Sequence, residues 1–143
     1  MDIAFTRISD QQHAVDIRRA DGTSERVEFD TRSFLRHDLA HFAVESEVPI
    51  RCGFWGSVAA GASLDGDDID GAEAALAESL AARVQTLMRL EAGTGGYLSV
   101  LGNVSPDLAS MELAARIHEH VRRLRGHWKA TPFGGVMRLV WPE

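Results

Sequence analysis

Two histidines and a glutamate recur at four-residue intervals in one segment of the chain. His37, His41 and Glu45 lie within the run His-Asp-Leu-Ala-His-Phe-Ala-Val-Glu at residues 37–45. In an α-helix, residues four apart are rotated by only about 40° from one another, so the three side chains would project from one side. Two imidazoles and a carboxylate so placed are suitable ligands for zinc or another divalent transition metal. The spacing therefore predicts a metal site made of His37, His41 and Glu45.

The acidic residue inside this run, Asp38, has a different expected role. The segment resembles the His-Glu-x-x-His helix of zinc proteases, with Asp38 in place of the glutamate that acts in them as general base. Aspartate is one methylene shorter, which favours a hydrogen bond to an imidazole N–H over contact with a metal-bound water. We therefore expect Asp38 to orient one of the histidine rings, and no proteolytic activity is carried over.

Other residues could complete the site. Three ligands leave an open metal position, as in catalytic sites, whereas a structural site needs a fourth ligand, for which His120 and His127 are the candidates. Phe34 and Trp55 are the candidate pocket walls. Residues 53–61 are expected to form a short helix or turn under the histidine helix, or else a pocket wall or a contact between two copies of the chain. Histidines and acids at helical spacing also form ordinary hydrogen bonds and ion pairs, so a structural role stays open.

A wider similarity rests on three stretches of sequence. Residues 34–45 read Phe-Leu-Arg-His-Asp-Leu-Ala-His-Phe-Ala-Val-Glu, and residues 53–61 read Gly-Phe-Trp-Gly-Ser-Val-Ala-Ala-Gly. Residues 128–135 read Trp-Lys-Ala-Thr-Pro-Phe-Gly-Gly and precede a short strand and Trp-Pro. In these stretches the chain resembles a family of small uncharacterised bacterial proteins. The resemblance implies a shared architecture and no particular activity.

The remaining patterns predict the elements that position these residues. β-prone runs at residues 3–8, 14–18 and 26–29, with an Asp-Gly pair at 21–22, predict an antiparallel meander. Helical periodicity follows at residues 33–48 and 71–91 and in a third helix from about residue 106, with Ser105 as its cap. The glycine-rich residues 92–104 are expected to be a mobile loop, and residues 135–141 a strand that joins the sheet. An α+β fold follows: one domain over residues 1–143, with a four-stranded antiparallel sheet packed with about three helices.

Composition restricts the partners and the compartment. A chain of 143 residues with a net charge of −6 is not expected to bind nucleic acid, because phosphate binding needs clustered positive charge. No apolar run reaches the roughly 18 residues of a membrane span, so no membrane partner is expected. The single cysteine, Cys52, and an N-terminus without an apolar signal segment favour the reducing cytoplasm. The acids at residues 65–70 do not have the spacing of a calcium loop, and the glycines at 93–96 lack the lysine of a nucleotide loop.

These observations leave two classes of function open. The first is a small metal-binding protein that uses His37, His41 and Glu45. A metal-dependent hydrolase is the more specific version of this hypothesis. The alternative is a non-catalytic binding or protein-interaction module in which the His/Asp/Glu face is structural or forms a small-ligand pocket. A weaker third option is an enzyme based on the Cys52 thiol. The sequence leaves open which substrate or partner is bound and whether the chain forms a homodimer.

Overall fold

The two ends of the chain combine in one sheet. In a computed structural model that describes residues 1–142, the strands are β1 (Asp2–Arg7), β2 (Gln12–Arg18), β3 (Ser24–Asp30) and β4 (Val136–Val140). Their order is β3-β2-β1-β4 and every pairing is antiparallel, which confirms the predicted four-stranded sheet. The turn between β2 and β3 depends on Gly22, whose φ of 88° costs glycine little.

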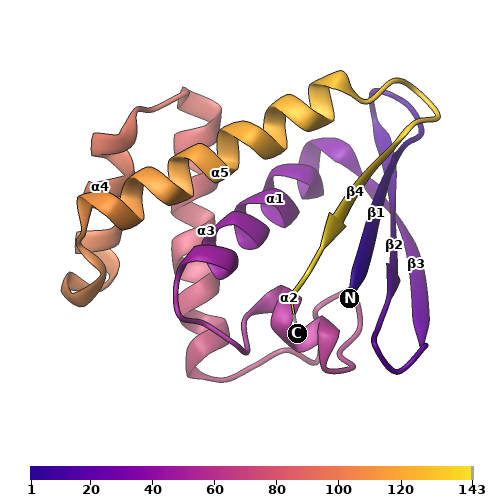
Figure 1. Cartoon of the computed structure of the whole chain (residues 1–143), viewed down its shortest axis with the longest axis horizontal. Coiled ribbons are helices and arrows are strands. Elements are labelled where there is room, and N and C mark those ends of the chain that lie inside the picture. The colour runs from indigo at the N-terminus through magenta and orange to yellow at the C-terminus, as the bar shows by residue number, and fades with distance from the viewer. Residues whose placement is uncertain (143) are drawn as a thin grey trace.

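The helices lie on one side of this sheet, with α1 at their centre (Figure 1). Within the described residues they are α1 (Thr31–Glu47), α2 (Phe54–Ala59), α3 (Ala72–Leu90), α4 (Thr94–Val104) and α5 (Met111–Ala130). Helix α1 packs against β2 and β3 and also against α2, α3 and α5. All of its residues from 38 to 45 are buried, because neighbouring elements surround that part of the helix. None of the helices in residues 1–142 is long and apolar enough to cross a membrane.

The glycine-rich segment before α5 differs from the expected mobile loop. Most of it forms α4, in which Tyr97 and Leu101 are each only 2% exposed. Glycine weakens a helix by about 1 kcal/mol per residue relative to alanine, and each buried large side chain contributes about 1.5–3 kcal/mol in the opposite direction. Packing of α4 against α3 and α5 therefore outweighs its low helix propensity.

The last helix begins later than the sequence suggests. Pro106–Leu108 form a single 3₁₀ turn, and α5 starts at Met111. The cap of α5 is Ser110, whose hydroxyl accepts the backbone N–H of Leu113 at 3.1 Å. The prediction of about three helices is corrected to five α-helices within residues 1–142, because α2 and α4 are helices of their own.

Candidate metal centre

Three potential metal ligands converge where α1 faces α3. His37 and His41 belong to α1, and Glu78 belongs to α3. One donor atom from each residue lies within 4.8 Å of the other two. Oε2 of Glu78 is 2.8 Å from Nε2 of His41 and 3.7 Å from Nε2 of His37. Both imidazoles therefore turn the same ring nitrogen toward one carboxylate oxygen.

The opposite nitrogen of each ring is held by a buried carboxylate. Nδ1 of His37 lies 3.0 Å from Oδ1 of Asp38, and Nδ1 of His41 lies 2.8 Å from Oε2 of Glu45. Asp38 and Glu45 are 4% and 3% exposed. An ionised carboxylate only accepts hydrogen bonds, so each Nδ1 donates. In metal-binding proteins this arrangement fixes the tautomer of a histidine and leaves Nε2 as the ligand atom.

The spacing of the donor atoms is compatible with a metal ion after a modest closure. Ligand atoms about 2.0 Å from a tetrahedral ion are about 3.3 Å apart, so the farthest pair must close by at most about 1.5 Å. The side chain of His41 is 2% exposed and contacted at both nitrogens, whereas those of His37 and Glu78 are 26% and 60% exposed. A cation bound between the two imidazoles would replace the contact between His41 Nε2 and Glu78.

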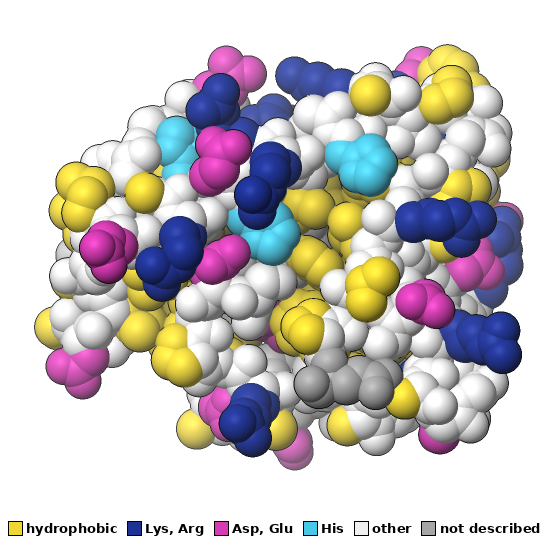
Figure 2. Space-filling model, viewed as in Figure 1, with side chains coloured by type: hydrophobic (Ala, Val, Ile, Leu, Met, Phe, Trp, Pro, Cys, Tyr) yellow, Lys and Arg dark blue, Asp and Glu magenta, His cyan; other side chains and the backbone are white. Residues whose placement is uncertain are grey.

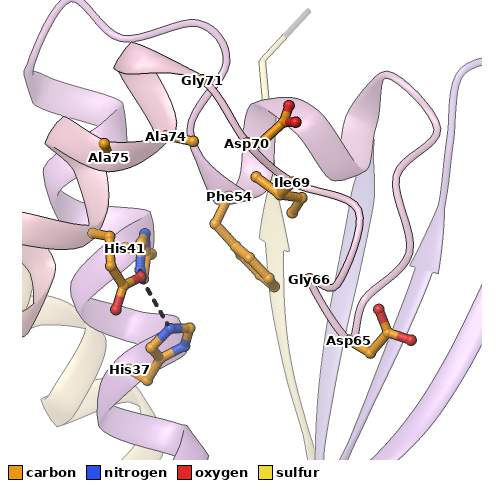
Figure 3. Close-up of a pocket in the computed structure, with 11 residues that line it drawn as sticks. His37, His41, Phe54, Asp65, Gly66, Ile69, Asp70, Gly71, Ala74 and Ala75 are labelled. Carbon is orange, nitrogen blue, oxygen red and sulfur yellow. Dashed lines mark hydrogen bonds and ion pairs between the residues drawn. The ribbon is translucent and has the colours of Figure 1, made fainter.

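A cavity of about 450 Å³ opens beside these ligands. Figure 3 shows His37 and His41 side by side on α1, with Phe54 reaching from α2 between them and the loop that carries Ile69. The Phe54 ring centroid is 5.7 Å from that of His37 and 5.6 Å from that of His41. Among the described residues that line the cavity there is no lysine or arginine. An ion bound here would therefore face open space bounded on one side by an aromatic ring.

The surrounding charges act on the half-buried imidazole of His37. Burial lowers the pKa of His37, but the hydrogen bond and charge of Asp38 and the charge of Glu78 act in the opposite direction. The net pKa lies above its ordinary value of 6.5. The neighbouring carboxylates thus favour a positive charge on the imidazole of His37.

Glu45, predicted as the third ligand, lies on the far side of His41 from Glu78. Besides His41, its carboxylate accepts the backbone N–H groups of Phe54 at 2.8 Å, Trp55 at 3.0 Å and Gly56 at 3.4 Å. These groups belong to the first turn of α2, which has no side-chain cap of its own. Glu45 therefore orients His41 and caps α2, and Glu78 is the carboxylate that lies with His37 and His41 in the group of potential ligands.

The approach of Glu45 to α2 requires a glycine. A Cβ atom at Gly53 would lie 2.4 Å from the carboxyl carbon and from Oε1 of Glu45. Any larger residue would displace the carboxylate that holds His41. Gly53 was not singled out from the sequence, because the close approach arises only when α2 folds back onto α1.

The carboxylate of Asp38 lies beside Nδ1 of His37, and its predicted role in orienting a metal ligand stays a prediction. The backbone carbonyl of Asp38 also accepts the indole N–H of Trp55 at 3.0 Å. Trp55 is fully buried and packs against α1, and it does not line the cavity. Phe54, its neighbour, lines the cavity instead.

The other candidates lie away from the cluster. His120 on α5 has Nδ1 3.2 Å from Oε1 of Glu47, and its pKa is lowered by burial and by the charge of Arg123 against the opposing charge of Glu47. His127 is exposed, and Figure 2 shows histidines among acidic and basic side chains on the face that α5 crosses. Phe34 is 43% exposed and contacts Phe29 at 5.2 Å between ring centroids. Cys52 is a free, exposed cysteine.

Glu78 is the functional candidate that sequence reasoning missed. It lies within the helix predicted at residues 71–91, but it is 37 positions from His41 and no local spacing relates the two. No protein-family model, curated protein or solved structure matches the chain, and its similarity to the family of small bacterial proteins stays a prediction.

Proposed function

We propose that this chain binds one divalent transition-metal ion through Nε2 of His37, Nε2 of His41 and the carboxylate of Glu78. The observation that carries the proposal is the opposed use of the two ring nitrogens. Both Nδ1 atoms are bonded to buried carboxylates, and both Nε2 atoms face the single carboxylate of Glu78. Metal binding requires donor atoms from separate residues to converge on one point while the other ring nitrogens are held, whereas ordinary pairing on a helix surface requires neither.

The donor set favours particular metals. Two imidazoles and one carboxylate suit zinc, iron, nickel or copper, whereas magnesium and calcium prefer oxygen ligands throughout. Zinc is the first ion to test, because two histidines and a glutamate with an open fourth position form a familiar catalytic zinc set.

We further propose hydrolysis as the reaction class. Structural zinc sites are closed by four protein ligands, and here three ligands face a cavity of about 450 Å³. A divalent ion with an open position polarises carbonyl or phosphoryl oxygens and activates water near neutral pH. The cavity provides space for a small substrate next to such an ion.

Metal content and metal affinity test the first part of the proposal. The chain, purified without a metal-affinity tag, is analysed for metals, stripped with a chelator and titrated with Zn²⁺ by calorimetry. We expect one ion per chain, and loss of binding in Glu78→Gln and in the double variant His37→Ala/His41→Ala. The matched controls Glu119→Gln and His127→Ala, both on the exposed surface of α5, should bind like the wild type.

Two results would contradict the proposal at different levels. Absence of stoichiometric binding in the wild type would reject the metal centre and favour a non-catalytic module with a structural histidine cluster. Stoichiometric zinc without metal-dependent turnover of ester, amide or phosphoester model substrates would leave the metal centre standing and reject hydrolysis.

A further inference from the structure

Besides His37, a histidine from the sheet approaches the carboxylate of Asp38. His13 belongs to β2 and is 0% exposed. Its ring stacks on Phe5 and Phe29, with centroid distances of 6.1 and 5.8 Å, and meets Trp128 edge-on at 6.0 Å. These three aromatic residues hold the plane of the imidazole. The directions of its two nitrogens are therefore set by packing.

One nitrogen of His13 has a hydrogen-bond partner and the other has none. Nδ1 lies 3.0 Å from the hydroxyl oxygen of Thr31. Nε2 is the one buried side-chain nitrogen or oxygen in residues 1–142 that lacks a hydrogen-bond partner. The nearest acidic group is Asp38, whose Oδ2 is 3.9 Å from this nitrogen. Buried polar atoms are nearly always paired, so an exception calls for an explanation.

The carboxylate of Asp38 determines which nitrogen of His13 carries the proton. A bare lone pair on Nε2 would face a carboxylate oxygen in a buried, weakly screened environment, which is repulsive. With the proton on Nε2, the N–H dipole points toward Oδ2, and the Thr31 hydroxyl donates to Nδ1. At 3.9 Å this is an electrostatic attraction and not a formed hydrogen bond.

We propose that His13 is a positioning residue for the metal centre and acts through Asp38. The two oxygens of Asp38 are divided between two histidines: Oδ1 accepts from Nδ1 of His37, and Oδ2 faces Nε2 of His13. The hydrogen bond at Oδ1 and the attraction at Oδ2 together restrain the rotation of this carboxylate, so His37 keeps its proton on Nδ1 and turns Nε2 toward Glu78. The inference rests on the proposed function for its effect on metal binding, whereas its effect on the His37 tautomer does not require a metal.

The variant His13→Phe tests this chain of contacts. Phenylalanine keeps an aromatic ring between Phe5 and Phe29 and removes both nitrogens. In the metal-free protein in alkaline buffer, ¹⁵N NMR of the imidazoles should show His37 mainly with its proton on Nδ1 in the wild type and as a mixture of tautomers in the variant. The affinity for Zn²⁺ should fall about tenfold, at the lower end of the roughly 10–100-fold losses seen for groups that orient metal ligands.

A matched control is available in the same chain. His118 also stacks on an aromatic ring, that of Tyr97 at 4.8 Å, and its Nδ1 also lies near a threonine hydroxyl, that of Thr94 at 2.9 Å. His118→Phe should change neither the His37 tautomer nor the affinity for Zn²⁺. In the Asp38→Asn background, His13→Phe should cause no additional loss of affinity, because the intermediary is already removed.

The outcomes separate this inference from the metal-binding proposal. A His13→Phe variant with the wild-type His37 tautomer and the wild-type affinity for Zn²⁺ would overturn the inference. If the wild type binds no metal, the proposed function fails, and an unchanged tautomer in the variant still overturns the inference. If His13→Phe does not fold, His13→Leu removes the same two nitrogens with a smaller side chain. It should shift the His37 tautomer in the same direction, and an unchanged tautomer there would overturn the inference as well.

Discussion

Replacement of Glu45 by glutamine should destabilise the protein, although the two side chains have nearly the same size and shape. Oε2 accepts from His41 Nδ1 and Phe54 N, and Oε1 accepts from Trp55 N and Gly56 N. In either orientation of the amide, the NH₂ group would replace one oxygen and leave two N–H donors without an acceptor. Each buried donor left unpaired costs about 1–3 kcal/mol.

A change of tautomer at His41 can relieve part of this cost. If the proton leaves Nδ1, that nitrogen can accept from the new amide, so we expect a net loss of about 2–4 kcal/mol in the free energy of unfolding. The proton then resides on Nε2, where it blocks metal binding. Glu45→Gln should therefore also weaken zinc affinity by roughly 10–100-fold, although Glu45 is not a ligand in this arrangement.

Urea unfolding of the metal-free protein, followed by circular dichroism, measures the first effect. Glu47→Gln is the matched control. Glu47 lies on the same helix and pairs with Arg116 at 3.3 Å and His120 at 3.2 Å, but it is partly exposed. Its loss should cost no more than about 1 kcal/mol. If Glu45→Gln destabilises the protein no more than Glu47→Gln does, the assignment of Glu45 as the buried acceptor of these N–H groups is refuted.

Three further predictions concern α1 and its contacts. Leu39 is 2% exposed, so Leu39→Ala should lower the free energy of unfolding by about 2–5 kcal/mol. A loss below about 0.5 kcal/mol in urea unfolding would place Leu39 outside the core. Asp38→Asn should weaken zinc affinity by roughly 10–100-fold in calorimetry; if a metal-dependent hydrolysis is found and the variant loses turnover with unchanged metal content, Asp38 is the general base instead. Burial lowers the pKa of His120, so the unfolded chain binds this proton more readily, and stability should decline as pH falls below about 6.5. In His120→Asn the free energy of unfolding, measured in urea, should depend less on pH in this range. An unchanged pH dependence would contradict the lowered pKa of His120.

Local periodicity was sufficient to predict the sheet and the long helices. The Asp-Gly pair at 21–22 marks a turn because glycine adopts positive φ, and the structure has Gly22 at 88°. The apolar period at residues 33–48 predicted α1, which the structure places at Thr31–Glu47 with Leu39 in its buried part. These signals depend on neighbouring residues alone, which is why they can be read without a structure.

The helix α4 and the start of α5 could not be obtained in this way. Glycines at 93, 95, 96 and 102 indicate a loop, and a proline at 106 after a serine indicates a helix start. Burial of Tyr97 and Leu101 against neighbouring helices decides the first case, and the side-chain cap formed by Ser110 decides the second. The first depends on contacts between segments, which local propensity does not contain, whereas the second is a choice between two nearby serines, of which only Ser110 forms a side-chain cap.

The candidate metal centre was likewise predicted from the sequence only in part. The sequence by itself determined that His37 and His41 share one side of a helix, since residues four apart lie almost above one another, and that Asp38 borders them. Only the tertiary structure decided which carboxylate completes the group. Glu45 has the right spacing, but α2 folds back over it and its oxygens accept backbone N–H groups. The packing of α3 against α1 instead brings Glu78 to the Nε2 atoms of His37 and His41. Helical geometry relates residues within one turn of each other, and the side chain that arrives from another helix depends on how the whole core packs.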